Sequence, residues 1–513
     1  MLHLSEQLSE QQIIRRKKLD QLKLLGINPY PSEEYYITTT IVNIQKKFTE
    51  KKTISIAGRL IRLRILGKAS FGEIQDHTGR IQIYLNKNHF DSEKMGKEDS
   101  YNIFLKKLID IGDIIGVKGF LFKTKMDEIT IHVHKLTLLS KSLRPLPQVK
   151  VDQNKKIYDA FSNTEQRYRM RYVDLIVNDH VKEIFLKRTR IIREMRNFLD
   201  KKGYIEVETP TLQSIPGGAV ARPFVTYHNS LGIPLYLRIA NELYLKRLII
   251  GGFHGVYEFS KNFRNEGMDR IHNPEFTVLE LYVAYKDYYW MMKFTEELIK
   301  CIYNKVVQKK DIFIIENKNI DFQKSFPRIP ILDAIKTHTG FDLIKMEEKD
   351  LRKVCKQLNI LNIKENIKMS KAKMIETIFE EKCEKHYIDP TFIIDYPIEM
   401  SPLTKKHRYK ENLSERFELI INGQEIANAY SELNDPIDQL DRFREQIKFS
   451  EKKSTDESMF LDKDFIRALE FGMPPTAGIG IGIDRLVMLL TKQNSIQEVL
   501  FFPQMRTEKE GKK

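Results

Sequence analysis

The sequence predicts an α+β protein in which a small N-terminal β-barrel precedes a larger domain built around an antiparallel sheet. Two observations lead to this prediction. Roughly five short alternating segments lie between residues 53 and 140, which is the size of a small closed Greek-key barrel. Beyond residue 155, helical stripes alternate with two strand-rich blocks, at 253–285 and 415–433. At roughly 100–200 residues per domain, 513 residues suggest two to four domains.

Composition excludes several classes of protein. Hydrophobic residues make up 41% of the chain and charged residues 30%, so we expect a large core and no general disorder. No stretch approaches the roughly 18 consecutive apolar residues of a membrane span, and the first residues lack the features of a signal peptide. The three cysteines (Cys301, Cys355 and Cys383) are too far apart for a thiolate metal site and odd in number for a disulfide framework. We therefore expect a cytoplasmic protein without a membrane partner.

The net charge of +15, from 85 basic and 70 acidic residues, favours polyanionic partners. An AT-rich genome produces the same lysine excess without selection for binding, so both explanations stay open. The N-terminal helix, expected from a capping-box pattern at Ser9 and Gln12, is equally ambiguous. Its basic run at 15–18 is either an RNA contact or a solvated face.

Local patterns place the main elements. Barrel strands are expected at five positions: 54–60, 71–76, 81–85, 113–120 and 129–133. The larger domain begins with a helix whose apolar residues from Val181 to Leu199 follow the 3.6-residue period. Gly203 ends this helix, and residues 204–210 are expected to form a strand stopped by Pro210. The region 286–400 is mostly helical and shows no pattern of chemical groups.

The first strand-rich block places a carboxylate in the middle of a buried-looking strand. Alternation puts four side chains on one face: Phe276, Val278, Glu280 and Tyr282. The other face is hydrophobic core. A buried carboxylate is costly unless it meets a cation, so Glu280 indicates a binding site. The alternative is a solvent-facing side of an antiparallel pair.

The second block contains Asn422-Gly423, a strong signal for a tight hairpin. A two-residue turn pairs Ile420 with Glu425 and brings Glu418 near the same point, as Mg²⁺ bound mainly through water and phosphates requires. Simple alternation puts Asn428 and Glu432 on the opposite face from Glu425. If all four side chains serve one site, a bulge is needed around residues 426–427.

The third pattern is Gly478-Ile-Gly-Ile-Gly-Ile-Asp-Arg485, in which alternating glycines indicate that another group approaches the strand closely. Too few residues follow Arg485 for a dinucleotide-binding half. The pattern instead predicts a glycine-floored groove with an arginine beside it, which suits a triphosphate.

Together these motifs carry a resemblance. Residues 263–266 (Phe-Arg-Asn-Glu) and 478–485 resemble the second and third signature motifs of class II aminoacyl-tRNA synthetases, and 203–210 resembles the first. Within that class, the chain is similar to the lysyl-tRNA synthetases of bacterial type from about residue 10 to 505. The stretches that carry this closer similarity are 215–224, 242–247, 273–277, 280–282 and 431–436.

The resemblance implies a domain organisation. A helical extension is expected at 1–50, an anticodon-binding OB-fold barrel at 51–145 and a linker at 146–160. The class II catalytic domain is expected at 161–513, with a helical insertion around 340–400. The long helix before Gly203 matches the element through which class II enzymes form homodimers.

The resemblance also implies ATP, L-lysine and tRNA(Lys) as substrates, with Mg²⁺ bound alongside ATP. Arg264 is expected to bridge the α-phosphate and the lysine carboxylate, and Arg485 to cover the adenine and the γ-phosphate. Further ATP contacts are implied for Glu266, His272, Asn273, Phe276 and Glu418. Mg²⁺ ligands are implied at Glu418 and Glu425. Lysine contacts are implied for Gly218, Glu242, Glu280, Tyr282, Asn428 and Glu432.

Charge separates lysine from the aspartate and asparagine used by related enzymes of the same architecture. Three glutamates and a tyrosine suit an ammonium group and repel a carboxylate. Rejection of ornithine is harder, because one methylene is worth only about 1–3 kcal/mol. Two rivals are a catalytically inactive nucleotide-binding paralogue and a paralogue that lysylates proteins. Both are disfavoured, the first by Arg264 and Arg485 and the second by the barrel.

In the barrel, the resemblance implies that Phe71 stacks on a central uracil of the anticodon, with Arg64 and Gln82 as polar readers. Stacking contributes about 1–3 kcal/mol per base and tolerates any sequence, so hydrogen bonds must select uracil. The alternative reading of Phe71 is a barrel core residue, which its place in an alternating strand favours.

Overall fold

The computed structural model describes nine ranges: 8–92, 99–147, 150–151, 157–158, 161–307, 313–316, 318–360, 369–451 and 461–507. The chain forms two compact units, residues 1–162 and 163–513. The expected linker at 146–160 lies largely outside the described residues. None of the helices within these ranges is long and apolar enough to cross a membrane.

The first unit contains the predicted five-stranded barrel. Its strands are β1 (Thr53–Leu66), β2 (Ala69–Gln75), β3 (Arg80–Asn86), β5 (Ile114–Lys123) and β6 (Ile129–Ser140). They pair in the order β3-β2-β1-β5-β6, and a parallel pairing of β3 with β6 closes the barrel. Shorter elements accompany them: β4 (Asp91–Ser92), α2 (Ile41–Lys46), the helical segment η1 (Ser100–Leu108), β7 (Lys150–Val151) and β8 (Ile157–Tyr158). Every predicted strand is confirmed, and most extend further than alternation indicated.

The N-terminal helix α1 (Glu10–Leu24) begins with the predicted capping box. Arg15 is buried, and its Nη2 donates to the backbone oxygen of Ile111 at 2.8 Å. Lys18 pairs with Asp110 at 2.6 Å. An RNA contact and a solvated face are therefore both wrong for Arg15, which attaches the helix to the unit.

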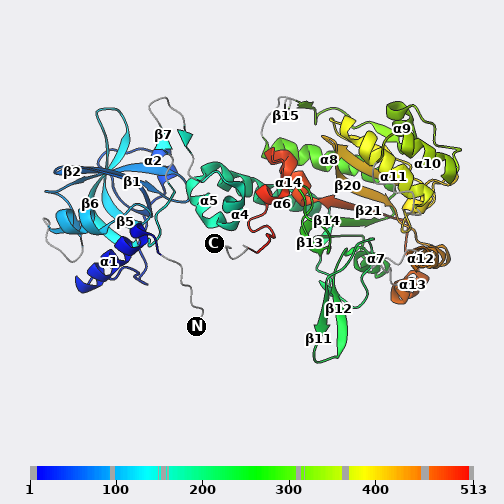
Figure 1. Ribbon diagram of the computed structural model, residues 1–513, viewed down its shortest axis with the longest axis horizontal. Helices are drawn as coiled ribbons and strands as arrows, with labels where there is room; N and C mark the ends of the chain where they lie inside the picture. Colours follow the sequence, from blue (N-terminus) through cyan, green and yellow to red (C-terminus); the bar gives the residue numbers. More distant parts are fainter. Residues whose placement is uncertain are drawn as a thin grey trace. The chain divides into compact units, whose positions relative to one another are not determined.

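The second unit is built on an eight-stranded sheet in the order β17-β18-β19-β20-β21-β14-β13-β9 (Figure 1). Its inner pairs are antiparallel, and the pair at each edge is parallel. The strands are β9 (Ile205–Glu206), β13 (Gly255–Phe263), β14 (Glu275–Ala284), β17 (Arg328–Pro330), β18 (Thr391–Ile394), β19 (Arg416–Ile421), β20 (Gln424–Ser431) and β21 (Thr476–Gly482).

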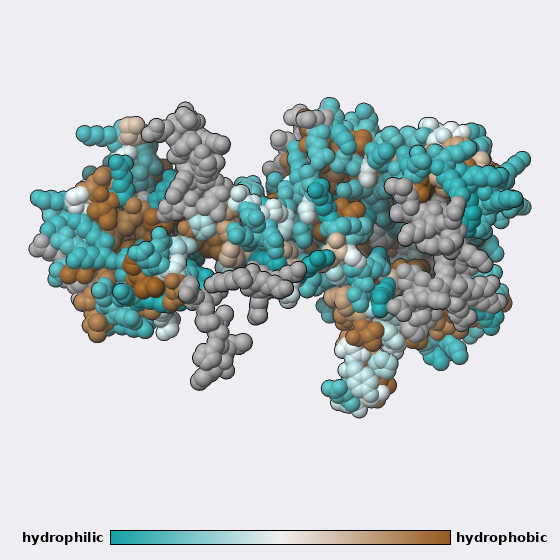
Figure 2. Space-filling model, viewed as in Figure 1, coloured by the Kyte–Doolittle hydropathy of each residue, from teal (hydrophilic) through white to brown (hydrophobic). Residues whose placement is uncertain are grey.

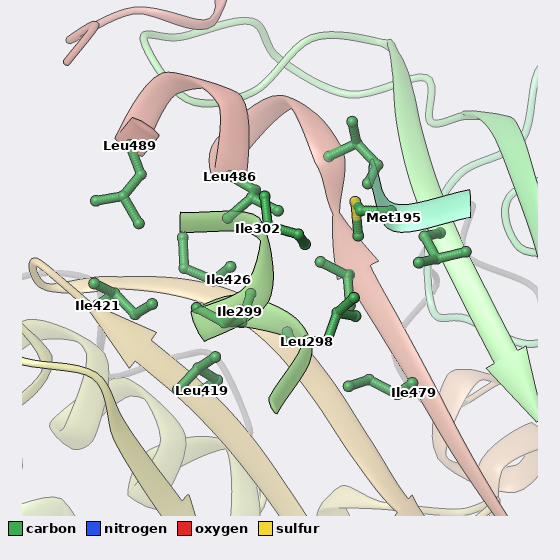
Figure 3. Packing of buried hydrophobic residues seen from close by; sticks show 14 of the residues in the cluster. Met195, Leu298, Ile299, Ile302, Leu419, Ile421, Ile426, Ile479, Leu486 and Leu489 are labelled. Atoms are coloured by element: carbon green, nitrogen blue, oxygen red, sulfur yellow. The ribbon is translucent and has the colours of Figure 1, made fainter. Parts of the chain in front are cut away.

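Three helices bury the apolar face of this sheet: α6 (Asp179–Lys201), α8 (Tyr288–Val306) and α14 (Ile483–Thr491). Figure 3 shows Leu298 and Ile302 of α8 packing among side chains such as Leu419 and Ile479 of the sheet. Alternation leaves the opposite face of the central strands free for polar groups.

The remaining elements surround the sheet. Helices α7 (Glu242–Ile250), α12 (Pro436–Glu451) and α13 (Lys463–Glu470) lie near its open face in Figure 1. Helices α9 (Ile331–Thr339), α10 (Glu348–Gln357) and α11 (Lys371–Lys382) enclose a separate apolar cluster. A small sheet contains β10 (Leu212–Gln213), β11 (Val225–His228) and β12 (Ile233–Leu237). The short elements are α4 (Thr164–Arg169), α5 (Arg171–Val177), β15 (Phe313–Ile315), β16 (Lys318–Ile320), η2 (Glu384–His386), η3 (Ile398–Met400) and α15 (Ile496–Val499).

One strand prediction is wrong in extent. The expected strand at 204–210 contains only the two residues of β9. Val207 still donates to the backbone oxygen of Tyr257 at 2.9 Å, but the chain leaves the sheet before Pro210. The strand is an exposed edge, so its alternation reflects little burial.

Candidate active site

A cavity of about 480 Å³ lies over the open face of β14, β20 and β21. Its wall combines the polar face of these strands with residues 216–223, the start of α7 and the loop 264–274. The predicted face of β14 is confirmed, because Phe276, Val278, Glu280 and Tyr282 all line the cavity. Glu280 is buried, so the alternative of a solvent-facing strand is wrong.

The glycines of β21 form the floor of this cavity. Each of them pairs with a residue of β14 that lines the cavity: Gly482 with Val278, Gly480 with Glu280, and Gly478 with Tyr282. A Cβ at Gly478 would collide with the side chains of Tyr282 and Glu432, whereas one at Gly480 would find only ordinary contacts. A side chain at 478 would therefore displace Tyr282 and Glu432, whereas the space above Gly480 belongs to the cavity.

Arg264 supplies an unpartnered cation to the cavity. It follows directly on β13, and its guanidinium lies 5.0 Å from the centre of the Phe276 ring. Within the described part of the chain, its side chain makes no ion pair, and the buried Nε has no hydrogen-bond partner. Burial lowers the pKa of Arg264, with nearby glutamates opposing the shift. A half-buried guanidinium without an ion-pair partner favours an anion, which the cavity has room to hold.

The predicted nucleotide-binding residues gather beside Arg264. Glu266, His272 and Asn273 all line the cavity. His272 lies 3.1 Å from Nη2 of Arg485, which connects the loop to α14. Arg264 also lies over the Phe276 ring; the placing of Phe276 and Arg485 on opposite sides of the adenine stays a prediction.

Asp484, which precedes Arg485 in the sequence, anchors the start of α14. The Asp484 carboxylate pairs with Arg188 of α6 at 2.6 Å and accepts from the backbone nitrogen of Thr277 at 2.7 Å. The Asp484 side chain therefore connects α14 to both α6 and β14. This anchoring fixes the start of α14, from which Arg485 Nη1 donates to Glu425 Oε2 at 3.2 Å.

The hairpin of β19 and β20 has the register that the sequence predicted. Ile420 pairs with Glu425, and Asn422 and Gly423 both adopt positive φ in the turn. The predicted bulge is present: Leu419 pairs with Ala427, so one extra residue enters β20 and Glu418 faces Asn428. The bulge brings Asn428 to the cavity wall that Glu425 also lines, whereas Glu418 and Glu432 are not among the residues that line the cavity.

The Glu418 and Glu425 carboxylates form the candidate metal site. Burial raises the pKa of Glu418 to about 7, the Arg416 guanidinium opposes this shift, and Glu425 adds to it. Two neighbouring carboxylates, of which Glu425 lines the cavity, fit Mg²⁺, because that ion keeps several waters and takes further ligands from phosphates. No cluster of three or more potential metal-binding side chains occurs among the residues described.

Behind the acidic end of the cavity, and not itself lining it, lies a lysine that sequence reasoning missed. Lys246 is completely buried, lies 2.6 Å from Glu242 Oε1, and also forms an ion pair with Glu432 Oε2. The Tyr430 hydroxyl donates to Glu242 Oε1 at 2.6 Å. Burial acts to lower the pKa of Lys246, but the two carboxylates outweigh it and raise the pKa. The i,i+4 spacing of Glu242 and Lys246 on α7 was the available signal.

Enough acceptor capacity remains at this end for further cations. Glu432 Oε1 has no hydrogen-bond partner among the described residues. Glu280 accepts from the Tyr282 hydroxyl at 2.9 Å, and burial, with repulsion from Glu242, raises the pKa of Glu280 to about 8. Gly218, with φ +86°, packs against Glu242, where a side chain would be strained. The site therefore carries more carboxylates than its one lysine neutralises.

Arg416, also missed from the sequence, stands behind both Glu418 and Asn428. Its Nη2 donates to Glu418 Oε1 at 2.6 Å, and its Nε donates to Asn428 Oδ1 at 3.1 Å. The two-residue spacing from Glu418 on β19 places it on the same face, but only the cross-strand register reveals the contact with Asn428.

The barrel presents the predicted anticodon residues on its outer face. Phe71 pairs with Arg64 and with Tyr84, whose ring centroid lies 5.1 Å from that of Phe71. Its neighbours in β2, Ser70 and Gly72, point into the barrel, so the core reading of Phe71 is wrong. Gln82 lies on the same outer face but already donates to Glu128 at 2.8 Å.

Comparison with known proteins identifies the family of the chain. Residues 163–506 match the family of class II tRNA synthetases (D, K and N), and residues 54–139 match the OB-fold nucleic acid binding domain. The chain therefore belongs to the class II tRNA synthetases. It is 58% identical over 508 residues to a lysine–tRNA ligase of Porphyromonas gingivalis, covering 98% of this chain and 86% of that protein. It is also 58% identical over 505 residues to the lysine–tRNA ligase of Azobacteroides pseudotrichonymphae, covering 98% and 99%.

Proposed function

We propose that this protein activates L-lysine with ATP to lysyl-adenylate and transfers the lysyl group to the 3′-terminal ribose of tRNA(Lys), releasing AMP and pyrophosphate. One observation carries the proposal. A single cavity holds an unpartnered arginine, Arg264, at one end and an excess of buried carboxylates at the other. A lysine molecule has the matching charges, one carboxylate and two ammonium groups.

The charges assign the orientation of the amino acid. Glu242, beside Gly218, would take the α-ammonium group, while Glu432, Glu280 and Tyr282 would surround the ε-ammonium group. The lysine carboxylate would lie toward Arg264 and Asn428. Aspartate and asparagine, which related members of this class use, offer no cation for the far end, so the acidic pocket favours lysine.

Activation then needs position and positive charge. The lysine carboxylate attacks the α-phosphorus in line, pyrophosphate leaves, and Arg264 stabilises the charge that develops on the α-phosphate. Arg485, Glu266, His272, Asn273 and Phe276 would hold the nucleotide. Mg²⁺, held by Glu418 and Glu425, would neutralise the phosphates of ATP when bound.

The transfer step requires tRNA recognition, which we assign to the outer face of the barrel. Phe71 offers a half-exposed aromatic ring, and Arg64 is exposed beside it. A base stacked on Phe71 would gain about 1–3 kcal/mol. Gln82 donates to Glu128 and accepts from the Thr130 hydroxyl at 2.9 Å, so it could read a base only by exchanging these contacts, and we assign it a secondary part. The tRNA substrate also makes a cytoplasmic location part of the proposal.

We further propose a homodimer. Apolar side chains are exposed on β9, on α6 and along the hairpin β11–β12, where Figure 2 shows pale and brown atoms. They include Ile205 (50%) on β9, Leu186 (61%) on α6, and Val225 (64%) and Leu231 (66%) in the hairpin. A short edge strand flanked by such residues suits association with another chain.

Amino-acid-dependent ATP–pyrophosphate exchange tests the activity without tRNA. We expect exchange with lysine and with none of the other nineteen standard amino acids at comparable concentration. Exchange with aspartate or asparagine would contradict the reading of the acidic pocket. Absence of exchange with every amino acid would point to an inactive paralogue.

A further inference from the structure

Nearly all hydrogen-bond donors of the Arg416 guanidinium are taken up by groups of the protein. Besides its bonds to Glu418 and Asn428, Nη1 donates to Ser401 Oγ at 3.0 Å and to the backbone oxygen of Met400 at 3.3 Å. The side chain is buried and stacks over Tyr396 at 4.5 Å. Arg416 therefore has little capacity to bind a phosphate itself, and any influence on the reaction passes through the groups it holds.

The first of these groups is Glu418. Arg416 donates to its Oε1, and the Tyr396 hydroxyl donates to its Oε2 at 2.8 Å. Each carboxylate oxygen accepts more than one hydrogen bond or ligand, so both retain acceptor capacity. The two donors fix the carboxylate in one orientation without exhausting it, as metal ligands require.

The second group is the side-chain amide of Asn428. A guanidinium has donors and no acceptor, so the amide must turn its oxygen toward Arg416. Its NH₂ group then lines the cavity as a donor, without a hydrogen-bond partner in the described part of the chain. An amide held this way binds a carboxylate and disfavours an ammonium group.

We propose that Arg416 is a positioning residue that gives Asn428 the polarity to bind the carboxylate of the amino acid and gives Glu418 the orientation to bind Mg²⁺. This inference rests on the proposed function of the cavity. Arg416 connects the amino-acid subsite to the metal subsite. One of its hydrogen bonds reaches Glu418 on β19 and the other reaches Asn428 on β20, the two strands of the bulged hairpin.

Lysinamide, which has both ammonium groups but no carboxylate, separates this role from general support of the pocket. In Arg416→Lys, charge is kept but a single ammonium cannot replace the planar donors. We expect the KM for lysine in the exchange reaction to rise about tenfold, equivalent to about 1.4 kcal/mol. The inhibition constant of lysinamide should stay within about twofold, and the Mg²⁺ concentration for half-maximal rate should rise.

Asn428→Ala is the matched control. It should reproduce the loss for lysine without the shift in Mg²⁺ dependence, and the double variant should lose no further lysine affinity. Equal losses for lysine and lysinamide, or additive losses in the double variant, would overturn the proposal. Should Arg416→Lys fail to fold, Asn428→Asp keeps an acceptor for Arg416 but lacks the N–H donors. Lysine but not lysinamide must then bind more weakly, and an unchanged KM for lysine overturns the proposal.

Exchange measured with the wild-type protein separates failure of the proposed function from failure of the role proposed for Arg416. If it fails to catalyse lysine-dependent exchange, the proposed function is wrong and the inference falls with it. If the wild type exchanges with lysine and the variants show no discrimination between lysine and lysinamide, the proposed function stands and only the role of Arg416 is wrong.

Discussion

The two ends of the cavity treat buried charge in opposite ways. At the acidic end, the carboxylates of Glu242 and Glu432 already share the ammonium of Lys246, and Tyr430 adds a hydroxyl donor. At the cationic end, Arg264 has no ion pair among the described residues. A charge with a partner is held in place before the ligand arrives, whereas a charge without one is balanced only by the ligand. The cationic end should therefore matter most to chemistry and least to folding.

The largest expected effect comes from removing the unpartnered charge. Arg264→Ala should reduce lysine-dependent exchange by about a thousandfold, because a donor aimed at developing charge is worth about 10²–10³ and Arg264 supplies more than one. The melting temperature should hardly change, since no ion pair is lost. Thermal unfolding and exchange kinetics check both points, and a large drop in melting temperature would assign Arg264 a structural role.

At the acidic end, a smaller and selective effect is expected. Glu432→Gln removes the charge that would face the ε-ammonium group, and hydrogen bonds to charged groups contribute about 1.5–3 kcal/mol. The KM for lysine should rise by about ten- to a hundredfold, while the KM for ATP should stay within about twofold. Steady-state exchange measures both constants, and equal increases would refute the assignment.

The pH dependence of lysine binding sharpens the same comparison. Burial, with repulsion from Glu242, raises the pKa of Glu280 to about 8, so the carboxyl is protonated in the free protein near neutral pH. A bound ammonium favours the carboxylate, so lysine should bind more tightly as pH rises toward about 8, by at most about tenfold per pH unit. Calorimetric titration with lysine, without ATP, measures this, and Glu280→Gln should flatten the profile. A flat wild-type profile would show that Glu280 does not titrate on binding.

The smallest effect on activation is expected from the barrel. Phe71→Ala should leave exchange unchanged, because Phe71 belongs to the other compact unit. It should weaken tRNA charging by about 1–3 kcal/mol. Aminoacylation and exchange assays on the same preparation separate these outcomes. Loss of exchange as well would mean that activation of lysine depends on the barrel.

Much of the site followed from local patterns in the sequence. The Asn422-Gly423 turn set the hairpin register, and the condition that four residues serve one site located the bulge that the structure contains. Alternation on β14 identified the lining face without any knowledge of the partner strand. These successes share a cause, since strand faces and tight turns are determined by neighbours in sequence.

What the sequence did not reveal depends on contacts between distant segments. In the sequence, Lys246 looks like an ordinary helix residue. Its ion pair with Glu432, the residue directly after β20, appears only in the folded chain. Arg416 gains its second bond only when β20 lies beside β19. Phe71 sits in an alternating strand, and which face of that strand is the barrel interior is decided by closure between β3 and β6.

The glycines of β21 differ in what their missing side chains leave room for. At Gly478 a Cβ would strike the side chains of Tyr282 and Glu432, which would have to move to make room. A methyl group at Gly480 would meet nothing closer than 4.0 Å. An alanine at position 480 would therefore be accommodated by the fold, and its methyl group would occupy space of the cavity rather than press on the protein.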